Sequence, residues 1–196
     1  MIYFSHIKAH VLHKLQYGLP SYLTYHNISH TLDVLKQCTT IAHESGIHNA
    51  EDVLLLKVSA LYHDTGFLYT YKGHEEKSCE IAMQELPQFG FTPKQIERVC
   101  SMIRATRLPQ SPKNELEKII CDADLDYLGR SDFFTVGEGL FQEFIHQKVV
   151  SDEQEWNQLQ VRFLENHQYF IATTIQKREA IKQQHLSLVK RKVAVS

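Results

Sequence analysis

The chain has 196 residues, of which 43% are hydrophobic and 22% are charged, and its formal net charge at pH 7 is −2. This composition is typical of one globular domain with a full core, and it excludes a disordered chain. The small net charge gives no electrostatic reason to expect a nucleic-acid partner. No apolar run approaches the roughly 20 residues that cross a bilayer, so no membrane partner is expected.

The start of the chain and its cysteines both indicate a cytoplasmic protein. MIYFSHIKAH has no basic flank followed by an apolar stretch, so no signal peptide is expected. The cysteines (Cys38, Cys79, Cys100 and Cys121) form no CxxC pair, and each stands in an apolar context. This pattern predicts buried, reduced thiols, which are typical of a reducing compartment.

Helical periodicity begins near the N-terminus and continues through the chain. Apolar residues from Ile7 to Leu15 form a first stripe, and residues 31–43 form a second helical segment. Within residues 51–64 (EDVLLLKVSALYHD), the stretch from Val53 to Tyr62 is apolar at all but two positions. This third helix is therefore predicted to lie at the centre of the core and to end at Gly66.

Two more helices follow, and the second has a clear start signal. One is predicted from about Glu75 to Leu86, where LPQFGF breaks it. The next begins at Thr92-Pro93-Lys94-Gln95, with Thr as the cap, Pro at the first helical position and Gln three residues after the cap. Its apolar face continues to Ile103.

The last third of the chain is also predicted to be helical. One helix covers residues 116–123, and Ser131 is predicted to cap another over residues 133–149. Ser151 is predicted to cap a last long helix that continues through Ile171. No alternating strand, internal repeat or linker is present. The sequence therefore predicts an all-α fold, a helical bundle in a single domain over residues 1–196.

Polar residues interrupt these apolar helices at specific places. In YHNISH, a spacing of four places His26 and His30 on one helical face. The apolar central helix ends in His63-Asp64, although a buried charge requires a partner. These residues are therefore candidates for a functional site.

A third helix carries carboxylates in the stretch IICDADLDYL, namely Asp122, Asp124 and Asp126. Three carboxylates within five residues repel one another unless a cation neutralises them. Two histidines and two aspartates on three different helices form a natural binding site for a divalent metal ion. A DxD stretch alone, or an isolated HD pair, would be a weak signal.

The order of these residues, H, then HD about 30 residues later, then D about 60 residues after that, resembles the HD-domain metal-dependent phosphohydrolases. This superfamily is all-helical, and the resemblance covers roughly residues 20–145, leaving C-terminal helices at about 151–190. It implies one or two divalent ions (Mn, Zn, Ni, Co, Mg or Fe), with four ligands: His30, His63, Asp64 and Asp124. Asp124 is preferred to Asp122 because the family's last ligand commonly follows a small residue and precedes another acidic one.

The stretch YHNISHTLDVL is also similar to the YHNxxHxxDV stretch of class I cyclic-nucleotide phosphodiesterases. In those enzymes the first histidine donates a proton to the leaving oxygen. The similarity implies that His26 is the general acid. Asp64 would then serve catalysis by bridging to a second, more weakly held ion.

The departures from related patterns narrow the prediction. Some HD proteins carry two further histidines that complete a di-iron or cyclic-dinucleotide site. His74 could be one of these two histidines. No histidine lies between residues 75 and 145, so the second one is missing. Stringent-nucleotide hydrolases and deoxynucleotide 5′-nucleotidases have an acidic residue where this chain has Phe67. This difference argues against both of these subfamilies.

The resemblance implies a hydrolase that uses metal-activated water on a nucleotide-like or other small phosphoester, either a monoester or a diester. Lys72, Arg104 and Arg107 are candidates for binding the phosphoryl group, because its negative charge must be met by cations. Two alternatives stay open: an HD-type di-iron oxygenase, and a non-catalytic metal-containing regulatory protein. The sequence leaves the substrate, the metal and the oligomeric state undetermined.

Overall fold

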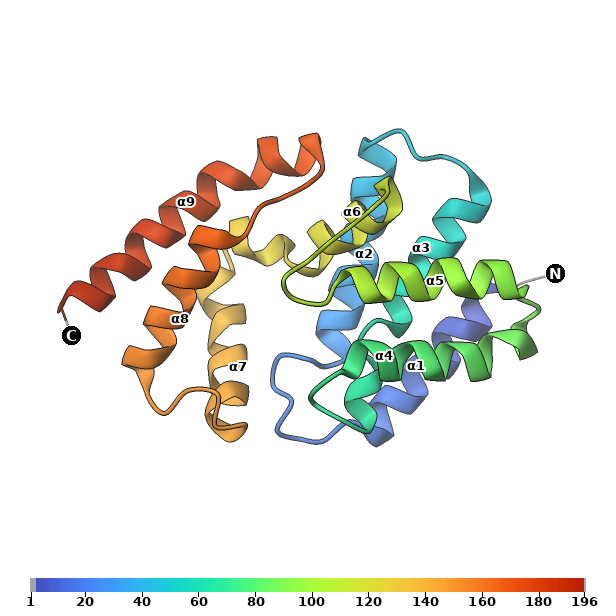
Figure 1. The fold of residues 1–196 in the computed structure, drawn as a ribbon, viewed down its shortest axis with the longest axis horizontal. Coiled ribbons are helices and arrows are strands. Elements are labelled where there is room, and N and C mark those ends of the chain that lie inside the picture. Colours follow the sequence, from blue (N-terminus) through green and yellow to red (C-terminus); the bar gives the residue numbers. More distant parts are fainter. Residues whose placement is uncertain (1–2, 196) are drawn as a thin grey trace. The chain divides into compact units, whose positions relative to one another are not determined.

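The computed structural model describes residues 3–195, and all regular secondary structure in this range is helical, as the sequence predicts. Contacts divide the chain into two compact units (Figure 1). Unit 1 comprises Met1–Pro20 and His26–Asp124, and unit 2 comprises Ser21–Tyr25 and Leu125–Ser196. The single domain over residues 1–196 stays a prediction, and each unit is described here by itself.

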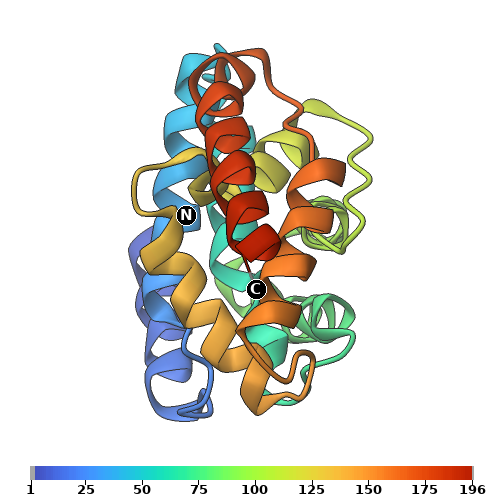
Figure 2. The ribbon, with the colours of Figure 1, turned by 90° about the vertical axis from the view of Figure 1, so that its left-hand side faces the viewer.

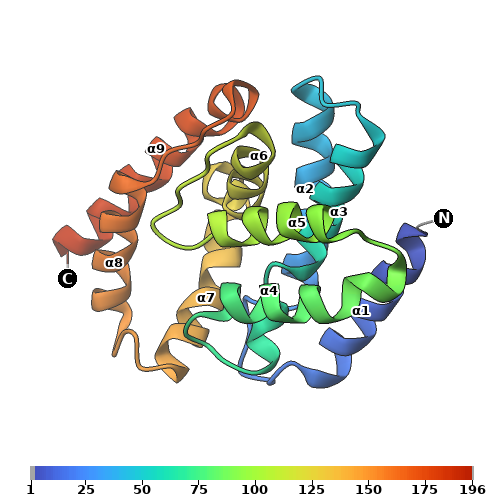
Figure 3. The ribbon, with the colours of Figure 1, turned by 45° about the vertical axis from the view of Figure 1, so that its right-hand side comes forward.

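Unit 1 consists of helices that pack around one central helix. Its α-helices are α1 (Phe4–Gly18), α2 (Ile28–Glu44), α3 (Ala50–Tyr62), α4 (His74–Glu85), α5 (Pro93–Ala105) and α6 (Glu115–Asp124). Two short 3-10 helices, η1 (Thr65–Leu68) and η2 (Leu86–Phe89), precede and follow α4. Figure 3 shows α4 and α5 side by side, in agreement with their contacts.

The nearly all-apolar helix α3 lies at the centre of unit 1, as its sequence predicts. Asn49 caps its N-terminus by accepting a hydrogen bond from the Asp52 backbone N–H at 3.0 Å. From Leu55 to Tyr62 every residue except Lys57 is buried. Because its apolar surface extends around the helix, α3 can pack against α1, α2, α4, α5 and α6 at once.

Local sequence signals set the helix boundaries in unit 1. The predicted start of α5 is confirmed: Thr92 and Gln95 form a capping box, and Pro93 is the first helical residue.

The predicted thiols are also confirmed as buried and free, at Cys38, Cys79, Cys100 and Cys121. Among residues 3–195, no helix combines the length and apolar character needed to span a membrane.

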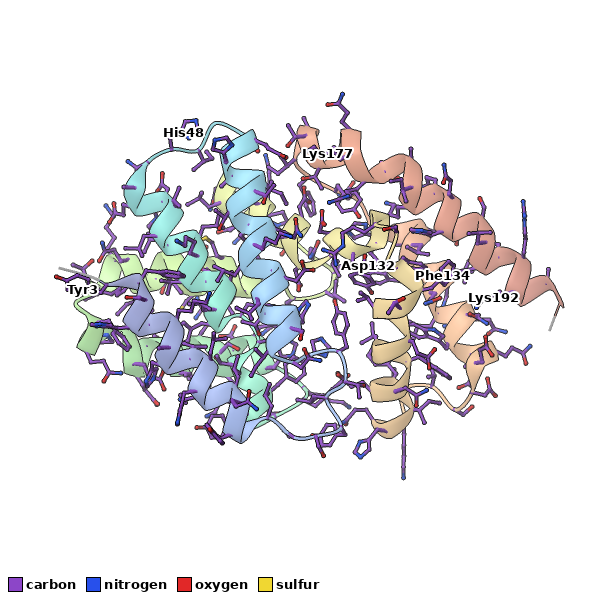
Figure 4. All side chains as sticks on the ribbon, turned by 180° about the vertical axis from the view of Figure 1, so that it is seen from behind. Tyr3, His48, Asp132, Phe134, Lys177 and Lys192 are labelled. Carbon is purple, nitrogen blue, oxygen red and sulfur yellow. The ribbon has the colours of Figure 1, made fainter. Side chains whose placement is uncertain are left out.

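Unit 2 contains α7 (Phe133–His146), α8 (Glu153–Asn166) and α9 (Ala172–Val195). Figure 2 shows α8 and α9 side by side, and a core including Phe133, Leu164 and Val189 joins these helices. On the outer surface, the Lys192 ammonium lies 5.4 Å from the centre of the Phe134 ring (Figure 4). Such a contact stabilises an exposed site only modestly, by about 0.5–1 kcal/mol.

Three predictions for unit 2 are wrong, and two of them concern α8. The last long helix does not continue through Ile171: α8 ends at Asn166, because the chain leaves helical geometry at His167 (φ −73°, ψ 137°), and α9 begins only at Ala172. There the carbonyl of His167 accepts a hydrogen bond from buried Lys182 of α9 at 2.6 Å. The cap of α8 is Asp152, whose side chain accepts from the Glu155 N–H at 2.9 Å, and not Ser151.

The cap predicted at Ser131 is also wrong. The residue before α7 is Asp132, and its side chain makes no capping hydrogen bond. Asp132 instead pairs with Arg130, whose guanidinium nitrogen lies 3.0 Å from its carboxylate. The helix therefore begins without the predicted hydroxyl cap.

Asp126, the last of the three clustered carboxylates, has cationic partners within unit 2. Arg178 Nε lies 2.8 Å from one of its oxygens, and Arg130 Nη1 lies 3.4 Å from the other. This pairing joins η3 (Asp126–Gly129) to α9. The charge of Asp126 is thus compensated by arginines and requires no metal ion.

Candidate metal centre

Four predicted ligands converge from helix ends within unit 1. His30 lies in the first turn of α2, which Asn27 begins by accepting hydrogen bonds from the N–H groups of Ser29 and His30 at 2.8 and 3.2 Å. His63 is the C-cap of α3, Asp64 follows it, and Asp124 is the last residue of α6. We refer to His30, His63, Asp64 and Asp124 as the quartet.

The nitrogens of the two histidines lie at closely similar distances from each other and from one oxygen of each aspartate. His30 Nε2 lies 3.3 Å from His63 Nε2. Oxygens of Asp64 and Asp124 lie 3.3 and 3.1 Å from the His30 nitrogen. The same oxygens lie 3.2 and 3.4 Å from the His63 nitrogen. Ligand atoms about 2.1 Å from one divalent ion have about this spacing at neighbouring coordination positions.

Two further features fit this quartet to a cation. The Nδ1 atom of His63 lies 2.9 Å from the backbone oxygen of Ala60, so Nδ1 carries the proton and donates it. In the neutral ring, this tautomer leaves the Nε2 lone pair directed at the quartet, which is the usual arrangement of a metal-ligating histidine. The buried Asp64 Oδ2 accepts no hydrogen bond, although two histidine nitrogens lie close to it. A bound cation would satisfy this oxygen.

Comparison with known families agrees with this geometry. A family model of the HD domain matches residues 27–126. The chain belongs to the HD-domain family. HD domains are a family of metal-dependent phosphohydrolases, and the matched range contains the whole quartet. It begins one residue beyond His26, so the YHNxxH similarity stays a prediction.

A solved structure shows the same fold. The chain resembles the crystal structure of a predicted HD superfamily hydrolase from an uncultured Thermotogales bacterium, with a TM-score of 0.62. The two chains are 22% identical, and the match covers 95% of this chain and 91% of that one. This likeness shows the HD fold alone. Among curated proteins, none matches this chain.

In the quartet, the charges of the two carboxylates are balanced by protonation of the two histidines. Burial by itself lowers the pKa of His30, but the carboxylates of Asp124 and Asp64 outweigh it and raise the pKa to about 9. The same carboxylates raise the pKa of His63 well above its usual range, against the effect of burial. Burial by itself raises the pKa of Asp64, but the charge of His63 and the His30 imidazole hold it well below its usual range.

This balance defines what an ion must replace. Without metal, the quartet contains two imidazolium groups and two carboxylates. A divalent ion that displaced both imidazolium protons would leave the total charge unchanged, and would remove two buried positive charges from the rings. His30, His63 and Asp124, whose donor atoms lie within 4.8 Å of one another, could hold such an ion.

His74 and Asp122 are the other residues that the sequence offers as possible ligands. His74 lies beside the quartet: its Nε2 is 3.5 Å from Asp64 Oδ1, the carboxylate oxygen that faces away from the histidine pair. Its Nδ1 is 3.3 Å from the backbone oxygen of Tyr71. Asp122 is buried, and the group of donor atoms within 4.8 Å of one another comprises His30, His63 and Asp124. The preference for Asp124 as the last ligand stays a prediction.

The imidazole ring of His26 lies beside the rings of His30, His74 and Phe67. Its imidazole centroid is 5.9 Å from that of His30, and 6.1 Å from that of His74. The ring stacks on Phe67 with 4.3 Å between centroids. His26 therefore lies near the quartet, and its role as general acid stays a prediction.

The candidate substrate-binding cations differ in their surroundings. Lys72 is exposed in the loop before α4. Arg104 and Arg107 contact carboxylates of α4: Arg104 Nε lies 3.1 Å from Glu76, and Arg107 Nε lies 3.6 Å from Glu75. Both guanidinium groups are thus engaged within the protein, which the sequence did not predict.

Two residues of the site were missed as such from the sequence. Phe67 was noted only because it is not acidic, yet its ring contacts both His26 and His74. Glu75 is buried, with one oxygen 3.8 Å from His74 Nε2. The stretch GHEE could have indicated Glu75, since a buried carboxylate next to a histidine requires a cationic partner.

Proposed function

We propose that this HD-domain protein is a metal-dependent phosphohydrolase that acts on a nucleotide-like or other small phosphoester, either a monoester or a diester. The observation that carries the proposal is that the Nε2 atoms of His30 and His63 lie 3.1–3.4 Å from each other and from one oxygen each of Asp64 and Asp124. Family membership supports the same reaction class. The small phosphorylated substrate is the partner that this chemistry requires.

In this proposal the quartet would hold a divalent ion, and such an ion would supply a water of lowered pKa and positive charge for the phosphoryl oxygens. His26 holds the proton that the leaving oxygen requires. Asp64 has a catalytic role because its second oxygen faces His74, so Asp64 and His74 together could extend the ligand set to a second cation.

Lys72, Arg104 and Arg107 remain the proposed phosphate-binding residues. Lys72 is exposed and close in sequence to His74. The side chain of Arg107 is 49% exposed, and its partner Glu76 is equally exposed, so solvent screens this ion pair. A dianionic phosphoryl group can therefore compete with Glu76 for Arg107 at modest cost.

Activity on generic phosphoesters tests the proposal. The metal-loaded protein is expected to hydrolyse p-nitrophenyl phosphate or bis-p-nitrophenyl phosphate, to lose this activity with a chelator, and to regain it with Mn, Co, Ni or Zn. Preference for the diester would indicate a phosphodiesterase, and preference for the monoester a phosphatase. Oxygen consumption without phosphate release would support the di-iron oxygenase instead, and bound metal without turnover the regulatory protein.

Metal uptake is also expected to release protons. At pH 7.5 the metal-free His30 is protonated, because its pKa is about 9, and His63 is shifted in the same direction. Metal binding should therefore release close to two protons. For each proton displaced, the metal affinity should fall by about tenfold when the pH is lowered by one unit. Calorimetry in buffers of different ionisation enthalpy measures this number. Release of no protons would contradict the assignment of His30 and His63 as ligands.

A further inference from the structure

The backbone that carries Phe67 is fixed against the start of α4. The Phe67 N–H donates to the Asp64 carbonyl at 3.1 Å. The hydroxyl of Ser78 on α4 accepts from the Gly66 N–H at 2.8 Å and donates to the His63 carbonyl at 2.7 Å. These bonds hold η1, the HD pair and α4 in one register.

Close approach of the two segments requires glycine at position 66. A Cβ atom on Gly66 would lie 2.0 Å from the backbone oxygen of His74, which no side chain can tolerate. The glycine brings η1 directly onto the first residue of α4. The distance between Phe67 and His74 is thus set by backbone contacts and not by side-chain adjustment.

From this position the Phe67 ring contacts two histidines of the site. Its centroid lies 3.9 Å from that of His74, with 20° between the planes. It lies 4.3 Å from that of His26, with 28° between the planes. The edge of Tyr71 closes the group at 5.3 Å, and Phe67 is only 4% exposed.

We infer that Phe67 is a positioning residue, whose buried ring sets the planes of the His26 and His74 imidazoles. Stacking fixes an imidazole plane without occupying either nitrogen, so the nitrogens stay available for a proton or a ligand. His63, in contrast, is oriented by a hydrogen bond from Nδ1 to the Ala60 carbonyl. The catalytic consequence of this inference rests on the proposed phosphohydrolase function, whereas the stacking itself does not.

The comparison of Phe67→Leu with Phe67→Tyr tests the inference. Leucine keeps an apolar side chain but removes the ring, and tyrosine keeps the ring. In the chelator-treated full chain, NMR should show the imidazole protons of His26 and His74 shifted upfield by the ring current, with signals assigned from His26→Gln and His74→Gln. Phe67→Leu should move both sets downfield, and Phe67→Tyr should restore them. Unchanged signals of either histidine in Phe67→Leu would overturn the inference.

Kinetics provide the second measurement. On an alkyl phosphate, Phe67→Leu should lower kcat by about 10- to 100-fold, because small displacements of a catalytic group have effects of this size. KM and metal content should stay near wild type, and Phe67→Tyr should regain most of the rate. In a His26→Ala background, Phe67→Leu should cause little further loss. Fully multiplicative losses would contradict positioning of His26.

The two measurements separate the inference from the proposed function. If the wild-type protein hydrolyses no phosphoester with any metal, the proposed function fails. The NMR comparison still decides whether Phe67 stacks on the two imidazoles, which the positioning role requires. If hydrolysis is found but the NMR signals do not respond to Phe67→Leu, the function stands and the inference fails.

Discussion

The Asp64→Ala variant is expected to lose most of its bound divalent metal while its helical content stays near that of the wild type. Asp64 Oδ2 lies 3.3 and 3.2 Å from the nitrogens of His30 and His63, and it is the buried oxygen without a hydrogen bond. Loss of even an outer-shell partner typically lowers metal affinity by 10- to 100-fold, so loss of a ligand should cost more than about 100-fold. Elemental analysis and circular dichroism measure the two quantities.

Asp122→Asn is the matched control for this prediction. Asp122 is on the same helix as Asp124, two residues earlier, and its side chain is fully buried. Its replacement should change metal content much less than Asp124→Asn does, because Asp124 alone of the two joins His30 and His63. If metal loss followed Asp122 instead, the register of the last ligand would be wrong. Full metal occupancy in Asp64→Ala would refute the site.

Much of the fold follows from local patterns. The Thr92–Gln95 capping box and the all-round apolar character of residues 51–62 identify α5 and the central helix α3 from sequence alone. The break after α8 does not follow, because no Gly or Pro occurs between Asn166 and Ala172. It depends on buried Lys182, which binds the His167 carbonyl only once α9 has packed back on α8. Such tertiary contacts leave no periodic signal.

The site was predictable where residue type carried the chemistry. His30, His63, Asp64 and Asp124 are polar residues on apolar helices, and this contradiction is visible in the sequence. The orientation of His63 by the Ala60 carbonyl is not visible, since every residue has a carbonyl. Helix ends that meet in space supply such contacts, and only the fold decides which ends meet.

The arginines illustrate a second limit. Arg104 lies in the last turn of α5 and Arg107 follows that helix, and the sequence predicts both as cations for a phosphate. Their partners Glu75 and Glu76 lie about 30 residues earlier, and they become neighbours only because α4 and α5 pack side by side. Ion pairs between elements depend on packing, so sequence spacing alone cannot predict whether a surface cation is occupied.

Replacing His26 should separate proton donation from metal binding. The His26→Ala variant is expected to keep its metal, because the residues whose donor atoms lie within 4.8 Å of one another are His30, His63 and Asp124. Removal of a general acid typically slows a reaction by about 10²- to 10⁴-fold. The loss should be largest for leaving groups that require a proton, such as an alkoxide, and smallest for p-nitrophenolate, which departs without one.

The comparison therefore uses two substrates with the same phosphoryl group, an alkyl phosphate and p-nitrophenyl phosphate, with metal content measured in parallel. His13→Ala is the matched control, because His13 lies on α1 and its ring contacts that of exposed Tyr17, with 4.8 Å between the centroids. It should leave both rates unchanged. Equal losses on both substrates in His26→Ala would show that His26 only supports the fold around Phe67. A loss of metal would make it part of the ligand set. A loss confined to the poor leaving group fits neither of these roles, and it would identify His26 as the group that delivers the proton.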